Sequence, residues 1–316
     1  MRHRNSDKET FRSYLISCGL NVVEEPKSAD IFVAIDYTES DQPLLEERKK
    51  LGKFSVLFRS EPKCVLPEAY KKENENLFDA IIKFGKPASV ERSSHWPQYW
   101  LKEQLFEQSV GHRSDRIAMI NANKLNLSEY ELYSLRRQCA VEINSVDLYG
   151  ESWNLNLISK SRTLIIEFLK DPIRHLFSMR NHTRYWFKNW PETMAPINKQ
   201  DILRMYKYTL VIENDRTYMS EKIFDALIAG CIPIYVGPSV VDYGIPADVV
   251  IEVKPTVTSV ALGIEAAKRL DFNTFHRRLH SWFSLETTEQ QHLGYHVMNR
   301  AMNLVYKEYE NFRKLI

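Results

Sequence analysis

The stretch YKYTLVIENDRTYMSEKIFDALIAGCIPIYVGP, residues 206–238, contains two apolar runs with a polar loop and a helical pattern between them. The first run is rich in β-branched and aromatic residues and predicts a buried strand that ends near Ile212. The second run, residues 231–237, predicts another strand. Strand, helix and strand in this order are typical of a parallel α/β sheet, which binds ligands at the carboxyl ends of its strands. The polar loop after Ile212 is therefore the first candidate for a binding site.

The helix expected between these strands begins near Ser220, a suitable N-cap, and ends before Gly230, which suits the left-handed position after a helix. Glu221 and Lys222 would then lie in the first turn, where a lysine opposes the helix dipole. An anionic ligand between the lysine and the unpaired amides would explain this mismatch. Alternatively, the charged residues of a surface loop pair with one another, and the residues alone do not decide between the two.

The same alternation occurs along much of the chain. A helix is expected at residues 44–52, ending at Gly52, and another after Ser128 as N-cap. Residues 88–100 are irregular and aromatic, and Pro97 prevents a helix there, so we place a boundary just after them. Further strands are predicted at residues 29–37, 53–59, 78–84, 115–120 and 145–149. The pattern predicts an N-terminal lobe at residues 1–110, a second lobe at 111–285 and terminal helices at 286–316.

Composition restricts the function. The 316 residues are 44% apolar and carry a net charge of only +2, which gives no reason to expect nucleic acid as a partner. The basic and aromatic residues 171–190 favour a face packed on its own domain, with peripheral membrane association or an acceptor-binding surface as the alternative. The four cysteines have neither disulfide nor zinc spacing, and no signal peptide or membrane span is visible. We therefore expect reduced thiols and a cytoplasmic protein, or a soluble catalytic fragment of a membrane-anchored enzyme.

Residues 206–238 resemble the donor-binding signature of the α1,3/α1,4-fucosyltransferases, glycosyltransferase family 10. In that family a strand ends in Phe-Glu-Asn and is followed by Tyr-Val-Thr-Glu-Lys, a helix, and a Val-Pro-Val strand before glycine. The counterparts here are Glu213 and Asn214, residues 218–222, and residues 232–234 before Gly237. The similar spacing over the whole stretch is far more specific than a Glu-Lys pair alone.

Two weaker matches support the resemblance. Residues 119–150 are similar to the family's strand ending in Ser-Asn, a helix with an arginine, and a Val-Asp-Ser-Tyr-Gly strand. The counterparts are Asn121 or Asn123, and Arg136 or Arg137. The family's arginine contacts the donor diphosphate, and we favour Arg136 for this role over Arg137. The alternative for either arginine is a surface side chain.

In the first predicted lobe, Glu61 lies where the family has a glutamate after a strand, the proposed general base. An inverting transfer needs a carboxylate that takes the proton of the acceptor hydroxyl. Three other acidic residues are alternative candidates for this base: Asp36, Glu39 and Glu68.

The resemblance implies an α/β protein of the GT-B class, with two Rossmann-like lobes facing a central cleft and helices at the C-terminus. It implies an inverting transfer of fucose from GDP-fucose to a glycan hydroxyl. No Asp-x-Asp stands in a strand-end loop, so we expect no obligatory metal or other cofactor. Another nucleotide sugar as donor, or a non-catalytic nucleotide-sugar-binding module, are the alternatives. The donor-binding residues expected are Asn123, Arg136, Arg137, Glu213, Asn214, Tyr218, Ser220, Glu221 and Lys222.

Overall fold

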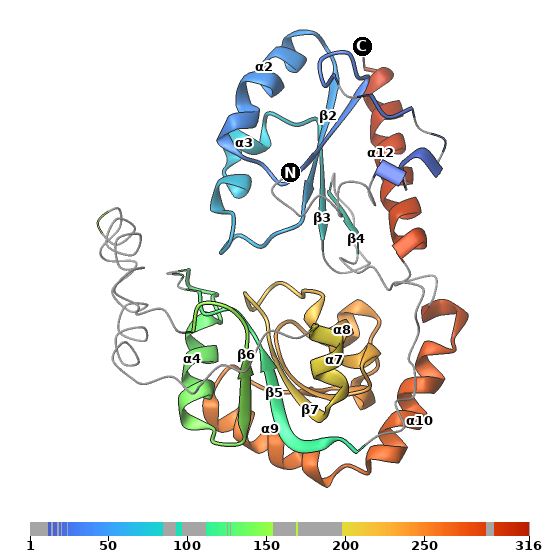
Figure 1. Cartoon of the computed structure of the whole chain (residues 1–316). Helices are drawn as coiled ribbons and strands as arrows, with labels where there is room; N and C mark the ends of the chain where they lie inside the picture. Colours follow the sequence, from blue (N-terminus) through green and yellow to red (C-terminus); the bar gives the residue numbers. More distant parts are fainter. Residues whose placement is uncertain are drawn as a thin grey trace. The chain divides into compact units, whose positions relative to one another are not determined.

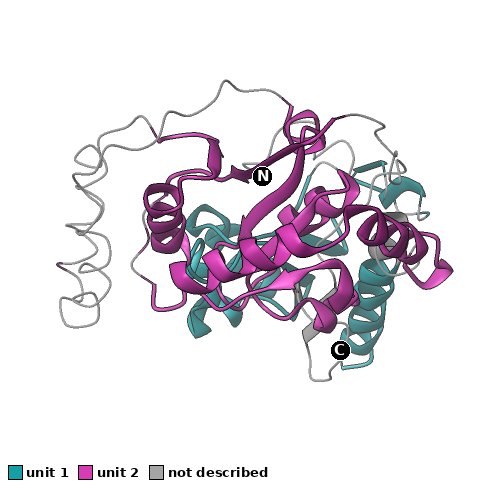
Figure 2. Cartoon of the chain, turned by 90° about the horizontal axis from the view of Figure 1, so that it is seen from below, with its two compact units in different colours: residues 1–102, 289–316 teal, residues 103–288 magenta. Residues whose placement is uncertain are grey.

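The computed structural model describes residues 12–84, 93–96, 112–153, 169, 198–288 and 294–315, apart from residues 14, 18, 20, 24, 125 and 127. The chain divides into two compact units, coloured separately in Figure 2. Unit 1 comprises residues 1–102 and 289–316, and unit 2 comprises residues 103–288. The C-terminal segment therefore belongs to the same unit as the N-terminal part of the chain.

Unit 1 is built on a four-stranded parallel sheet in the order β1-β2-β3-β4. Its strands are β1 (Ile31–Ile35), β2 (Phe54–Arg59), β3 (Ala80–Phe84) and β4 (Ser93–Trp96). In Figure 1 the sheet lies between α2 (Gln42–Lys50) and the terminal helix α12 (Gly294–Arg313). The short elements η1 (Glu39–Asp41), η2 (Pro67–Tyr70) and α3 (Lys72–Glu75) complete the described part of unit 1.

Alternate residues of β2 supply the cores on the two faces of this sheet, because successive strand side chains point to opposite sides. Phe54, Val56 and Phe58 pack with Ala301, Met302 and Val305 of α12. Leu57 packs on the other side with a cluster that includes Leu45 of α2. A sheet covered on both faces explains why β2 is buried along its whole length.

Unit 2 contains a five-stranded parallel sheet in the order β6-β5-β7-β8-β9. Its strands are β5 (Ser114–Ile120), β6 (Val146–Tyr149), β7 (Tyr206–Ile212), β8 (Ile232–Val236) and β9 (Ile251–Glu252). The first strand in the chain, β5, lies inside the sheet and the second lies at its edge. The order therefore reverses between β5 and β7, and ligands bind at such switch points in open α/β sheets.

Helices connect and cover the strands of unit 2 (Figure 1). They are α4 (Tyr133–Glu142), α7 (Lys199–Arg204), α8 (Lys222–Ile228), α9 (Val257–Arg269) and α10 (Phe272–Phe283), with the 3-10 turns η4 (Val240–Tyr243) and η5 (Ala247–Val249). α7 and α8 contact each other and β7, and α9 packs against β8 and β9. None of the helices in the described ranges is both long and apolar enough to cross a membrane.

The predicted strands and the helix that ends before Gly52 are confirmed, and Gly52 and Gly230 both have positive φ as expected. Three local predictions were wrong. Residues 93–96 form β4, because pairing with β3 gives Ser93 and its neighbours hydrogen bonds that their own sequence pattern does not predict. The other two concern Ser128 and Ser220, the two expected N-caps.

Helix α4 begins at Tyr133, and Ser128 does not cap it. The carboxylate of Glu131 accepts the Ser134 amide at 2.9 Å and the Ser134 hydroxyl at 2.5 Å. Glu131 is 8% exposed. The Ser134 amide lies in the first turn of α4, where amides have no partner within the helix. Glu131 accepts its hydrogen bond and so caps the helix in the way predicted for Ser128.

Cys64, Cys139 and Cys231 are buried in the described structure, in agreement with the prediction of reduced thiols, and Cys18 lies outside the described residues. Burial raises the pKa of Cys139 and of Cys231 to about 12. Thiols with such values carry little thiolate at neutral pH, so these two residues are structural. The stretch of residues 171–190 and Trp100 also lie outside the described residues.

Candidate functional site

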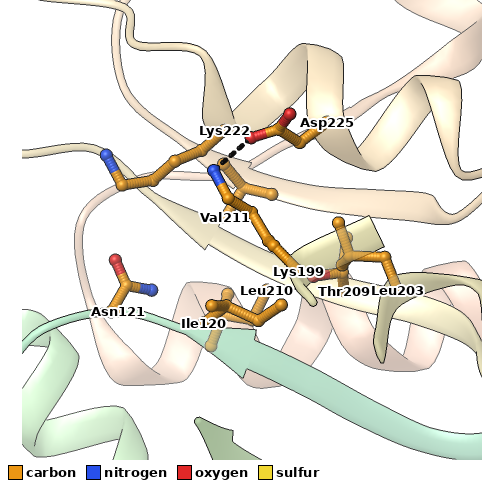
Figure 3. A pocket seen from close by; sticks show the side chains of 9 residues that line it. All are labelled: Ile120, Asn121, Lys199, Leu203, Thr209, Leu210, Val211, Lys222 and Asp225. Atoms are coloured by element: carbon orange, nitrogen blue, oxygen red, sulfur yellow. Dashed lines mark hydrogen bonds and ion pairs between the residues drawn. The ribbon is translucent and has the colours of Figure 1, made fainter. Parts of the chain in front are cut away.

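The polar residues that follow β5 and β7 meet at the switch point of unit 2. Asn121 follows β5, and Glu213 and Asn214 follow β7. A pocket opens at this edge and is drawn in Figure 3. Its lining comes from β5, β7, α7 and α8 and consists of Ile120, Asn121, Lys199, Leu203, Thr209, Leu210, Val211, Lys222 and Asp225.

Glu213 is completely buried and is held by the start of the next helix. Its carboxylate accepts the Ser220 amide at 2.8 Å and the Ser220 hydroxyl at 2.5 Å, and Tyr235 donates to it at 3.4 Å. Burial raises the pKa of Glu213, although the Lys222 ammonium at 3.8 Å and the Ser220 donors oppose the shift. With these partners around it, the carboxylate supports the loop from inside.

Lys222 is the first residue of α8, and its side chain is 19% exposed. Its ammonium donates to the Ser220 hydroxyl at 2.7 Å, which in turn donates to Glu213. Ser220 is therefore not the N-cap predicted from sequence, because its hydroxyl is turned toward the buried carboxylate. These two hydrogen bonds, from Lys222 to Ser220 and from Ser220 to Glu213, position the Lys222 ammonium at the edge of the pocket.

Glu221, Asp225 and Lys199 form a second charged group on the α7–α8 side. Lys199 lies 2.5 Å from the Asp225 carboxylate and 3.5 Å from that of Glu221. The neighbouring ammonium groups of Lys222 and Lys199 hold the pKa of Glu221 below its ordinary value. For Asp225, burial raises the pKa. This group joins the first turn of α8 to α7 and so supports Lys222.

Arg136 is 2% exposed and is bound to the end of β7. Its guanidinium donates to the Ile212 carbonyl at 2.7 and 3.2 Å and to the Asn214 side-chain oxygen at 2.8 Å. It also lies over the Tyr133 ring, 4.6 Å from the centroid. Arg136 therefore fixes the direction in which the chain leaves β7.

Arg137, the other arginine considered for the diphosphate, is 1% exposed. It donates to the Lys124 carbonyl at 2.5 Å and to the Asn123 side-chain oxygen at 3.4 Å. Burial lowers its pKa to about 10. Asn123 is also 1% exposed, so both residues hold the loop after β5.

The loop after β7 is itself ordered by Asp215, which is 2% exposed. Its carboxylate accepts the Thr217 amide and hydroxyl at 2.7 and 2.6 Å. The backbone forms isolated bridges from Asp215 to Glu131 and to Tyr218. Tyr218, expected in the donor pocket, is 8% exposed within this turn.

Glu61 lies in unit 1, two residues after β2, and is half-buried. The Asp36 carboxylate accepts the Ser60 amide at 2.7 Å and the Glu61 amide at 3.2 Å, and Tyr70 donates to the Glu61 carbonyl at 2.8 Å. The backbone of Glu61 is thus fixed at the carboxyl edge of the sheet, and Asp36 serves as its support.

Two charged residues at the pocket were missed from sequence, Lys199 and Asp225. Asn121 was considered only as an alternative to Asn123. Lys199 begins a helix of six residues whose pattern is too short to detect, and Asp225 sits in the middle of an apolar stretch. Within the described part of the chain, no three His, Cys, Asp or Glu side chains form a group that could hold a metal ion.

No protein-family model matches the chain. A curated fucosyltransferase-like protein of Arabidopsis thaliana is 38% identical over 53 residues, which is 16% of this chain and 10% of that protein. The match thus spans only about a tenth of the relative's own length.

Solved structures are similar over almost the whole chain. An α1,3-fucosyltransferase has a TM-score of 0.56 and 13% identity, over 96% of this chain and 88% of that one. HepE of Anabaena, solved with UDP and glucose, has a TM-score of 0.55 and 9% identity, over 94% of this chain and 81% of that one. An α,α-trehalose-phosphate synthase (UDP-forming) of Burkholderia xenovorans, solved with glucose-6-phosphate, has a TM-score of 0.53 and 12% identity, over 96% and 79%.

The fold is GT-B. The predicted fold class is confirmed, and so is the resemblance to a fucosyltransferase, through the likeness in structure and the local sequence match. At these identities the structural similarity concerns the glycosyltransferase fold.

Proposed function

We propose that this GT-B protein is a glycosyltransferase that moves fucose from GDP-fucose to a hydroxyl group of a glycan. The observation that carries the proposal is the Lys222 ammonium at the switch-point pocket, held by Ser220 and the buried Glu213. A fixed cation at this edge suits a nucleoside diphosphate, which is the leaving group of such a transfer. The fucosyltransferase-like signature around it favours GDP-fucose among possible donors.

In the proposed reaction the acceptor oxygen attacks the anomeric carbon of fucose, and the bond from that carbon to the diphosphate breaks. The proton of the acceptor hydroxyl passes to the Glu61 carboxylate, and GDP leaves. A single displacement of this kind inverts the anomeric configuration. Lys222 balances the charge that develops on the diphosphate, a task for which no obligatory metal is proposed.

The contacts suggest different roles for the other expected donor residues. Glu221 carries a carboxylate whose side chain is 60% exposed, so it is available to sugar or ribose hydroxyls. Arg136 donates a hydrogen bond to the Asn214 side chain, and in our proposal the two residues fix the loop that leads to Lys222. If Arg136 also contacts the diphosphate, its bonds to the end of β7 must change on binding.

A second candidate function is transfer from a UDP-sugar. Two similar structures favour it, HepE solved with UDP and glucose and the UDP-forming trehalose-phosphate synthase. A nucleotide-sugar-binding module without activity is the third candidate, and the presence of Glu61 together with Lys222 argues against it.

Thermal unfolding of the protein with GDP, GDP-fucose, UDP and UDP-glucose separates the first two candidates. A ligand at one hundred times its dissociation constant stabilises the native state by about 2.7 kcal/mol, which is a clear shift in melting temperature. We expect GDP-fucose to raise it, whereas a response to UDP-glucose alone would favour the second candidate. Incubation with GDP-fucose on a glycan array, read by mass shift, then identifies the acceptor, and the absence of transfer on any glycan would favour a binding module.

A further inference from the structure

The side chain of Asn121 has a buried polar atom for which the fold provides no partner. The residue follows β5 and is 4% exposed. Its side-chain oxygen accepts no hydrogen bond from any described residue. Buried amide oxygens in native proteins are nearly always bonded, so this atom calls for a donor from outside the protein.

The backbone of Asn121 is fixed from three directions. Its amide donates to the Tyr149 carbonyl at 3.0 Å, and the Trp153 indole donates to its carbonyl at 2.6 Å. A Cβ atom on Gly150 would lie 2.2 Å from the same carbonyl oxygen, so the backbone at Gly150 is in close contact with the backbone at Asn121. A residue held this way cannot move its side chain to another partner by shifting the backbone, and the side chain remains at the pocket.

Figure 3 shows this side chain among the residues that line the pocket, with its oxygen directed toward the side on which Lys222 lies. An amide oxygen only accepts, and an ammonium only donates. A ligand hydroxyl can do both, because it donates to Asn121 and still accepts from a neighbouring cation. A phosphate oxygen only accepts and would be repelled by the amide oxygen.

We propose that the side-chain oxygen of Asn121 accepts a hydrogen bond from a hydroxyl group of the nucleotide sugar, so that Asn121 selects donors by that hydroxyl. This inference rests on the proposed function. The hydroxyl belongs either to the transferred sugar or to the ribose, and these two sources share the same chemistry. Asn121 is then a specificity residue that contacts the substrate without taking part in proton transfer.

The test uses isothermal titration of the full chain with GDP, GDP-fucose, UDP and UDP-glucose. The variants are Asn121→Ala, which removes the acceptor, and Asn121→Asp, which keeps an acceptor of the same shape. Asn273→Ala on the exposed surface of α10 is the matched control. Loss of one such hydrogen bond corresponds to about tenfold in affinity.

We expect Asn121→Ala to weaken binding of the parent's donor about tenfold, and Asn121→Asp and Asn273→Ala to stay within about threefold of the parent. If the hydroxyl is on the sugar, only the nucleotide sugar is affected, and if it is on the ribose, the free nucleotide is affected equally.

Equal affinities of the parent and Asn121→Ala would overturn the inference. Asn121→Asp binding as weakly as Asn121→Ala, or more weakly, would also overturn it and indicate a phosphate at the amide. A parent that binds none of the four ligands would overturn the proposed function and this inference together. If Asn121→Ala unfolds, deoxy analogues of the bound donor are titrated into the parent instead. One analogue must then bind about tenfold more weakly than the donor, and equal affinities of all analogues would overturn the inference.

Discussion

After β1 and β2 in unit 1, the Asp36 carboxylate is occupied by the amides of Ser60 and Glu61, whereas after β5 in unit 2 the Asn121 oxygen has no partner in the described structure. Both edges belong to parallel sheets with similar sequence patterns. The first edge uses its buried polar group to position a backbone, and the second leaves one directed at a pocket. A buried polar group at a strand end can therefore either position the backbone or face a ligand site. The presence or absence of hydrogen-bond partners within the protein distinguishes the two.

A second contrast concerns charge. At the edge of unit 2, Lys222 is supported by a buried carboxylate and lines a pocket. In unit 1 the buried cation at the end of β2, Arg59, pairs with Glu75, donates to the Ala69 carbonyl at 3.0 Å and lies over the Tyr70 ring. Arg59 is therefore structural. With Glu61 in unit 1 and Lys222 in unit 2, we expect unit 1 to supply the base and unit 2 to bind the donor.

The largest expected effect tests the base in unit 1. Glu61→Gln should lower turnover about a thousandfold, because loss of a general base typically costs 10²–10⁴ in rate. Affinity for GDP should not change. Turnover is measured by fucose transfer and GDP affinity by titration. Glu68→Gln is the matched control, since Glu68 lies in η2 of the same unit and pairs with Lys71. A Glu61→Gln enzyme as active as the parent would remove Glu61 from the mechanism.

The next effect concerns the close approach at the edge of unit 2. Gly150 has a φ of +121°, and a side chain there would meet the Asn121 carbonyl. Gly150→Ala should lower the free energy of unfolding by about 3 kcal/mol, from backbone strain and overlap. Gly52 has a φ of +63°, and a Cβ atom added there would have no other atom within 4 Å. Gly52→Ala should therefore lower the free energy of unfolding by only about 1 kcal/mol. Urea unfolding measures both, and equal losses would show that the contact with Asn121 is unimportant.

Lys222→Met tests the cation at the pocket. A hydrogen bond to a charged group contributes about 2 kcal/mol, so affinity for GDP should fall about 30-fold. Lys268→Met on α9 is the control, because Lys268 pairs with Glu265 at 3.7 Å on the surface. Titration with GDP that gives the same affinity for Lys222→Met and the parent would contradict the proposed donor site.

The smallest effect is a pH dependence from Glu213. Burial raises its pKa in the folded state above the unfolded value, so its stabilising contribution is complete below the unfolded pKa and is lost as pH rises through the folded pKa. The difference in unfolding free energy between the parent and Glu213→Gln should fall with rising pH above about 4.5, by about 1.4 kcal/mol per pH unit between the two pKa values.

Urea unfolding of both proteins from pH 4 to pH 8 measures this difference. The comparison with Glu213→Gln removes the contribution of Asp225 and Asp79, whose pKa values burial also raises. A difference that grows with pH would mean that Lys222 dominates over burial and lowers the pKa of Glu213.

Much of the fold was predictable because its signals are local. The apolar runs in β2, β7 and β8 are long, as expected for strands covered on both faces, and Gly52 and Gly230 follow their helices as predicted. Strand β4 and helix α7 were not predicted, since each is short and depends on contacts with β3 or with α8 and β7. The expected lobe boundaries at residues 110 and 285 remain a prediction.

The sequence by itself determined two parallel α/β sheets and a polar loop at the end of β7, because strand patterns and helix ends depend on neighbouring residues. Only the tertiary structure decided which polar side chains support the loop and which face the pocket. Glu213 is bound by Ser220, Arg136 by Asn214, and the Asn121 backbone by Trp153. These partners are 7 to 78 positions apart in the chain, so their pairing depends on how the strands are ordered in the sheet.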